Sequence, residues 1–68
     1  MPENLTEKQK AVFDYLEDYI ARNGFSPTIK EIAGYMHIYP AAVSQHLRLI
    51  ERKGYIKRVG KRAIRILK

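Results

Sequence analysis

The sequence predicts a mostly α-helical domain with a small β-hairpin, the architecture of a three-helix winged helix-turn-helix. Two Thr-x-x-Gln/Glu patterns, at Thr6 and Thr28, are typical of the capping boxes that start helices. Pro40 suits the first position of a further helix, so only a short turn separates that helix from the one before it. After Gly54 the apolar residues change from helical spacing to the alternation that is typical of strands.

The first helix is expected over residues 6–23. It opens at Thr6, and its apolar side chains recur at helical spacing in one stripe: Val12, Phe13, Leu16, Tyr19 and Ile20. Gly24 can adopt the left-handed conformation that stops a helix, and Pro27 prevents the helix from resuming at once. The stripe predicts that this helix packs by one side against the rest of the domain.

The second and third helices are expected over residues 28–36 and 40–53, with the turn at residues 37–39. Four residues give the second helix its buried side: Ile29, Ile32, Ala33 and Met36. The turn consists of His37, Ile38 and Tyr39. Gly54 ends the third helix.

The hairpin, or wing, is expected over residues 55–67. Strands at 55–59 and 62–67 would flank Gly60-Lys61, a pair that is typical of hairpin turns. Two strands alone are only marginally stable in water, so their apolar face must pack on the helices. We expect Ile56, Ile64 and Ile66 to form that face.

Length and composition limit the protein to a small number of classes. The chain has 68 residues, which fits one domain over residues 1–68, and it has no cysteine for a disulfide, a thiolate nucleophile or a zinc finger. No apolar run approaches the roughly 20 residues that span a bilayer. The N-terminus also lacks the apolar stretch of a signal peptide. We therefore expect a cytoplasmic protein without membrane contact.

The sequence gives no indication of an enzyme. Ser26 and Ser44 have no plausible Ser/His/Asp arrangement, and His37 and His46 lack a third metal ligand. There is no glycine-rich phosphate loop. We expect no catalysis, no metal and no cofactor, and we interpret His46 as a packed histidine at the edge of the core.

Charge is strongly polarised along the chain. The net charge is +6, but residues 48–68 contain nine basic side chains against Glu51 alone, whereas residues 1–47 contain four basic and six acidic side chains. The basic residues alternate with apolar ones, which favours a folded basic surface over a loose tail. Such a surface is typical of proteins that bind a polyanion.

The third helix separates into two faces on a helical wheel. One face is apolar apart from His46 and should be buried: Ala42, Val43, His46, Leu47, Leu49 and Ile50. The other face has the small and polar residues that a recognition helix needs: Ala41, Ser44, Gln45, Arg48 and Arg52. Gln45 can contact adenine through two hydrogen bonds, and Arg48 can contact guanine or a phosphate. We expect Ser44 to contact a base or the backbone, and Arg52 to lie near the backbone.

Further contacts are expected to the phosphate backbone, which supplies affinity and register rather than sequence preference. In the wing, four basic residues in or beside the turn can reach phosphates: Lys57, Arg58, Lys61 and Arg62. Thr28, at the start of the second helix, and Tyr39, just before the third, complete the predicted backbone contacts. The predicted partner is double-stranded DNA, which would place the protein on the nucleoid.

Three alternatives stay open at this point. A winged helix can serve as a protein-interaction module, because fold alone does not fix function. The basic segment could also bind nucleic acid without sequence preference, through charge alone. Finally, Tyr15, Tyr19 and Tyr35 resemble a stacking platform for single strands, although core packing is the simpler interpretation.

Many of these residues resemble the N-terminal DNA-binding domain of the LexA repressor family. The matching segments keep their order and spacing over nearly the whole chain: Leu5-Thr6, Gln9, Val12-Phe13-Asp14, Asn23-Gly24, Pro27-Thr28, Glu31-Ile32-Ala33, Pro40, His46-Leu47 and Lys53-Gly54. The resemblance implies a winged helix-turn-helix that binds operator DNA with its third helix in the major groove and represses genes. By that resemblance, bases would be read by Ala41, Ala42, Ser44 and Gln45, with Arg48 nearby. We expect a monomer in solution or a weak homodimer on palindromic DNA.

The sequence departs from this family in three respects. The self-cleaving C-terminal domain of the family has no counterpart in these 68 residues, so its chemistry is not carried over. Ala41 and Ser44 replace larger polar or acidic residues of well-known members, which leaves the operator sequence open. His37 replaces the usual turn glycine, so the resemblance implies a left-handed backbone at His37, which is strained for a residue other than glycine. Tyr39 replaces the Ser or Thr before Pro40, so the Tyr39 side chain is free to touch DNA.

Overall fold

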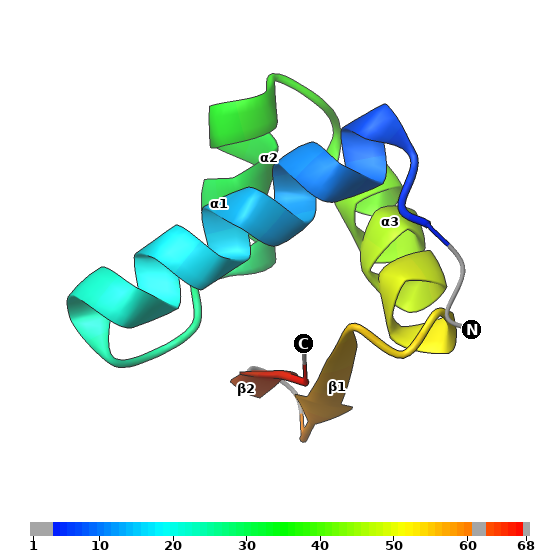
Figure 1. Ribbon diagram of the computed structural model, residues 1–68. Helices are drawn as coiled ribbons and strands as arrows, with labels where there is room; N and C mark the ends of the chain where they lie inside the picture. Colours follow the sequence, from blue (N-terminus) through cyan, green and yellow to red (C-terminus); the bar gives the residue numbers. More distant parts are fainter. Residues whose placement is uncertain (1–3, 61–62, 68) are drawn as a thin grey trace.

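The computed structural model describes residues 4–60 and 63–67, which form three helices and a two-stranded antiparallel hairpin (Figure 1). The elements follow in the order α1 (Glu7–Asn23), α2 (Ile29–Met36), α3 (Pro40–Arg52), β1 (Ile56–Val59) and β2 (Ala63–Ile66). Helices α1 and α2 both pack against α3, and the hairpin lies below them beside the end of α3. The predicted fold class is confirmed.

Both predicted capping boxes are present at the helix starts. Thr6 Oγ1 accepts from the Gln9 N–H at 3.2 Å, and the Thr6 N–H donates to Gln9 Oε1 at 3.2 Å. The same exchange joins Thr28 and Glu31, at 3.0 and 2.9 Å. These bonds satisfy backbone N–H groups that have no partner within the helix, and so fix where α1 and α2 begin.

The turn between α2 and α3 depends on one strained residue. His37 has φ 57° and ψ 43°, the left-handed conformation that the family resemblance implies there. Its N–H donates to the carbonyl of Ala33, and the N–H of Ile38 donates to the same carbonyl at 3.1 Å. These bonds close the end of α2 and let Pro40 start α3 after only residues 37–39.

The core lies where the three helices and β1 meet. Seven side chains are almost completely removed from solvent: Val12, Leu16, Ile32, Val43, Leu47, Ile50 and Ile56. Ala33, which is also buried, provides a small side chain on α2 where that helix packs on α3. Tyr19 and Ile20, at the far end of the predicted α1 stripe, are only half-buried.

The described strands of the hairpin pair in antiparallel register. Ile56 pairs with Ile66 and Val59 with Ala63. Gly60 has φ 66°, a left-handed conformation that suits glycine. The expected start of the second strand, at Arg62, lies outside the described residues. Ile56 is buried and Ile64 and Ile66 are half-buried, which confirms the predicted inner face.

Two side chains fasten the hairpin to the helices. The Ser26 hydroxyl accepts from the Ile64 N–H at 2.8 Å and donates to the Ile64 carbonyl at 3.2 Å. The Glu51 carboxylate accepts from the Arg58 N–H at 3.0 Å. Because a two-stranded hairpin is marginal alone, these bonds and the burial of Ile56 hold the wing in place.

A further contact joins the two ends of the helical core. Lys53 Nζ donates to Gln9 Oε1 at 2.7 Å and to the carbonyl of Asn4 at 3.0 Å. Gln9 is buried, with 5% of its surface exposed. The Lys53 ammonium therefore supports the start of α1 and is not part of the exposed basic surface.

Candidate nucleic-acid interface

Helix α3 has the two faces that its sequence predicts. Val43, Leu47 and Ile50 are buried on one side. On the other side, four residues are exposed and Ser44 is half-buried; the exposed ones are Ala41, Gln45, Arg48 and Arg52. Within residues 4–60 and 63–67, no hydrogen bond or ion pair involves the side chains of Gln45, Arg48 or Arg52. Their donors and acceptors are available to a ligand.

The N-terminal end of α3 is open and partly apolar. Tyr39 precedes the helix with 84% of its surface exposed, and its side chain makes no capping hydrogen bond. It lines a shallow hollow together with His37, Ile38 and Ala42. Ala42 is half-buried, so it belongs partly to the packed face and partly to this open end.

The start of α2 has a negative charge beside its predicted backbone contact. The hydroxyl of Thr28 already accepts from the Glu31 N–H, which leaves its O–H as the donor for a phosphate. The Thr28 N–H, which donates to the Glu31 carboxylate, holds the pKa of Glu31 below its ordinary value, with a smaller contribution from the Tyr19 hydroxyl. A charged carboxylate next to Thr28 opposes phosphate binding there.

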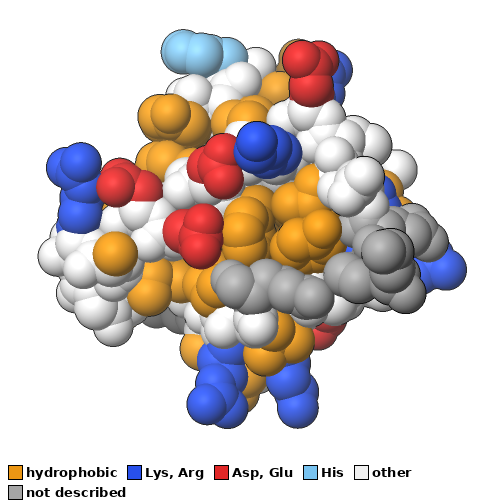
Figure 2. All heavy atoms as spheres, in the orientation of Figure 1, with side chains coloured by type: hydrophobic (Ala, Val, Ile, Leu, Met, Phe, Trp, Pro, Cys, Tyr) orange, Lys and Arg blue, Asp and Glu red, His pale blue; other side chains and the backbone are white. Residues whose placement is uncertain are grey.

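Among the described residues, the wing has basic side chains on both faces of the hairpin. Lys57 and Arg58 are neighbours in strand β1, so their side chains leave opposite faces of the hairpin. Arg58 pairs with Ile64 on the inner face and lines a groove of about 790 Å³ between the hairpin and the α1–α2 connection. Lys57 is on the outer face, and Lys61 and Arg62 lie outside the described residues. Figure 2 shows basic side chains projecting from the hairpin end of the molecule.

Arg65 is a basic residue of the wing that the sequence interpretation did not select. It is exposed and pairs with Lys57 across the hairpin. In the sequence it stands in a simple alternation between Ile64 and Ile66, which marks it only as an outward-facing strand residue. Only the strand register shows that Lys57 is the cross-strand neighbour of Arg65.

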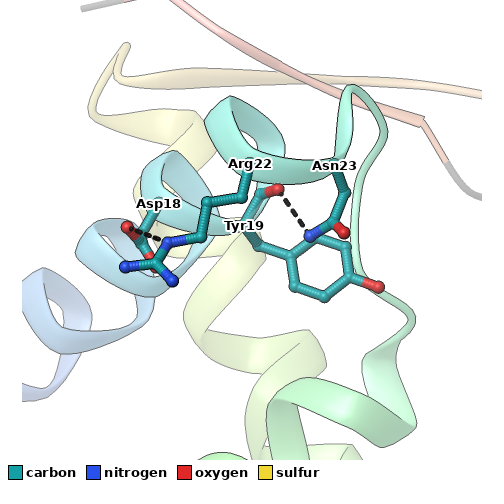
Figure 3. Close-up of polar contacts among 4 residues, drawn as sticks. All are labelled: Asp18, Tyr19, Arg22 and Asn23. Atoms are coloured by element: carbon teal, nitrogen blue, oxygen red, sulfur yellow. Dashed lines mark hydrogen bonds and ion pairs between the residues drawn. The ribbon is translucent and has the colours of Figure 1, made fainter.

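The tyrosines of α1 and α2 contact one another and the Glu31 carboxylate. The rings of Tyr15 and Tyr35 stack on each other, with centroids 4.2 Å apart and planes 19° apart. The Tyr19 hydroxyl donates to the Glu31 carboxylate at 3.1 Å. Tyr19 also lies beside the last turn of α1, where Arg22 pairs with Asp18 at 3.0 Å and Asn23 donates to the Tyr19 carbonyl (Figure 3). These mutual contacts favour structural packing.

The described residues contain no cluster of three or more metal-ligating side chains. Nor do they include a helix that is long and apolar enough to cross a membrane. His46 is half-buried at the core edge, and its Nδ1 is buried without a hydrogen-bond partner among the described residues.

Helices α2 and α3, joined by three residues and followed by a packed hairpin, make this a winged helix-turn-helix protein. Residues 2–64 match the family described as the LexA DNA binding domain. The chain belongs to this family.

Its relatives include bacterial LexA repressors. The LexA repressor of Thermotoga maritima is 45% identical over 67 residues, which cover 96% of this chain and 34% of the relative. That of Thermosipho melanesiensis is 44% identical over 54 residues, or 79% of this chain and 27% of the relative. The chain thus spans about a third of the length of the curated relatives it matches.

Proposed function

We propose that this domain binds double-stranded DNA with sequence preference and acts in transcriptional repression, with α3 in the major groove. The main evidence is the exposed face of α3. The side chains of Gln45, Arg48 and Arg52 on this face make no hydrogen bond or ion pair within the described residues, while the opposite face is buried. A helix fixed on one side and open on the other can enter a groove without rearrangement. The repressor relatives support the regulatory part of the proposal.

Base recognition is assigned to α3. Gln45 contacts adenine through its amide, and Arg48, one turn further on, contacts guanine or a phosphate. Ser44 contacts a base or the backbone. Ala41 and Ala42 allow close approach at the N-terminal end, where an alanine methyl group can contact the methyl group of thymine.

Backbone contacts are assigned to residues around this face. Arg52 follows Arg48 by one turn of α3, and Tyr39 lies just ahead of the helix with an exposed hydroxyl. Lys57 contributes from the outer face of the wing. Thr28 and Arg58 remain weaker candidates, because Glu31 adjoins the first and the second lies on the inner face. Lys61 and Arg62 complete the set.

Selection of bound sequences from a random duplex library, at about physiological salt, tests the proposal because non-specific binding is weak there. We expect an enriched motif containing an A·T pair for Gln45. An inverted repeat, with half-sites about one helical turn apart, would indicate that two monomers pair on the site. Retention without enrichment that disappears as salt rises would leave only charge-driven binding and would overturn the proposal.

A further inference from the structure

The strand register of the wing places two cations opposite each other. Lys57 and Arg65 are Cα partners in the antiparallel ladder, and both are exposed. Directly opposed residues in such a ladder have Cβ atoms about 4.5–5.5 Å apart, so the two side chains are immediate neighbours. They lie on the outer face, since Ile56 and Ile66, one position away in each strand, form the inner face.

This pair has no acidic neighbour to neutralise it. Glu51 is the single acidic residue in positions 48–68, and its carboxylate already accepts from the Arg58 N–H. Among the described residues the only ion pair is Arg22–Asp18, in α1. Like charges directly opposite each other destabilise a hairpin, so this arrangement weakens the wing when nothing is bound.

The register cannot shift to separate the charges. A slip of one residue would turn Ile56, which is 1% exposed, out of the core and turn Lys57 inward. The hydrogen bonds between Ser26 and Ile64 fix the same register from the second strand. The opposed cations are therefore a constant feature of the folded wing.

We propose that Lys57 and Arg65 jointly bind one backbone phosphate of duplex DNA on the outer face of the wing. A guanidinium offers two parallel N–H donors to a phosphate and an ammonium offers a compact charge, so the two groups can share one anion. The bound phosphate also removes the repulsion between them. This inference rests on the proposed DNA binding, to which it adds Arg65 as a contact and a shared phosphate.

The test compares Arg65→Gln with Arg22→Gln, which removes the same charge from the far end of α1 (Figure 3). Arg65→Gln should weaken binding to all duplexes about three- to tenfold, and it should lower the slope of log affinity against log salt by no more than about 0.9, because Lys57 still contacts the shared phosphate. Arg22→Gln should leave both affinity and slope unchanged. Equal affinities for the two variants would overturn the inference.

The double variant Lys57→Gln/Arg65→Gln tests whether the phosphate is shared. If both residues bind one phosphate, the double variant should lose about 0.9 in slope, the value for that single phosphate. A loss of about 1.8, the value for two separate phosphates, would refute sharing. The base preference of each variant is measured alongside. A wild-type protein without base preference would refute the proposed function, while these slopes would still decide the role of Arg65.

Charge reversal separates a binding role from a structural one. Arg65→Glu places a carboxylate opposite Lys57, so the melting temperature should rise because a repulsive pair becomes attractive, while DNA affinity should fall more than for Arg65→Gln. Opposite signs for stability and binding are the expected result. A fall in both would show that Arg65 supports the fold and would overturn the inference.

Discussion

At the start of α2, Thr28 and Glu31 exchange two hydrogen bonds, and Tyr19 donates a third to the same carboxylate from α1. The exchange fixes the first turn of α2. The bond from Tyr19 ties α2 to α1. Because α2 leads directly into the turn before α3, these hydrogen bonds help to set the direction of α3.

The pKa of Glu31 gives this site a pH dependence. Hydrogen bonding lowers the pKa of Glu31 in the folded state below the ordinary 4.5, so its contribution to stability is present above that value and is lost as pH falls through the lower folded-state pKa. Glu31→Gln keeps an acceptor for the capping box but does not titrate in this range. We expect the variant to lose less stability than the wild type between about pH 7 and about pH 3, as measured by urea unfolding. Parallel losses in both proteins would contradict this assignment.

At the scale of elements, the position of the wing depends on Ser26. This residue lies in the α1–α2 connection, and its hydroxyl bonds both the N–H and the carbonyl of Ile64 in β2. The Ser26 side chain therefore makes the two backbone contacts that a neighbouring strand would otherwise make. Its loss would leave a part-buried N–H of Ile64 without a partner.

Ser26→Ala should lower the free energy of unfolding by about 1–3 kcal/mol, the cost of an unsatisfied buried group. It should also loosen the wing and so reduce the salt dependence of DNA binding. Denaturant unfolding and salt titration measure the two effects, with Ser26→Thr, which keeps the hydroxyl, as the control. Unchanged stability in Ser26→Ala would show that Ile56 alone holds the hairpin.

At the scale of the whole molecule, stability comes from a small core that each element shares. A domain of this size buries only about 60% of the surface of its unfolded chain, so each core side chain matters. Ile56 is the one hairpin residue among the fully buried side chains of the described residues, and the hairpin contacts α3 through β1.

Ile56→Ala should therefore destabilise the protein by about 2–5 kcal/mol, through lost burial and a residual cavity. That is a large share of the total of about 5–15 kcal/mol typical of folded domains. Val59→Ala, at an exposed position of the same strand, is the matched control and should have a small effect. Urea unfolding of both variants measures the difference, and equal effects would show that the wing does not share the core.

Local patterns in the sequence predict the elements well, because their signals lie within a few residues of each other. The capping boxes at Thr6 and Thr28 are such cases. Contacts between distant residues leave no local pattern: the bonds from Lys53 to Gln9, 44 positions apart, and from Ser26 to Ile64, 38 positions apart, appear only in the fold. The same holds for the wing, where the strand register places Arg65 opposite Lys57.

The candidate site divides in the same way. The exposed face of α3 follows from helical periodicity, so its residues are found correctly as a surface, and their roles toward bases remain proposals. The wing contacts depend on strand register, which the sequence does not give, so the inner-face position of Arg58 and the pairing of Arg65 with Lys57 come from the structure.

The most direct test of base reading by α3 is the affinity of Gln45→Ala for a selected site and for variants of that site with single base pairs changed. We predict a loss of about 1–3 kcal/mol on the selected site and a relaxed preference at one A·T pair, with preferences elsewhere unchanged. Arg52→Ala, on the same helix, should weaken all sequences alike. If Gln45→Ala also weakened all sequences alike, α3 would not be reading bases through this residue.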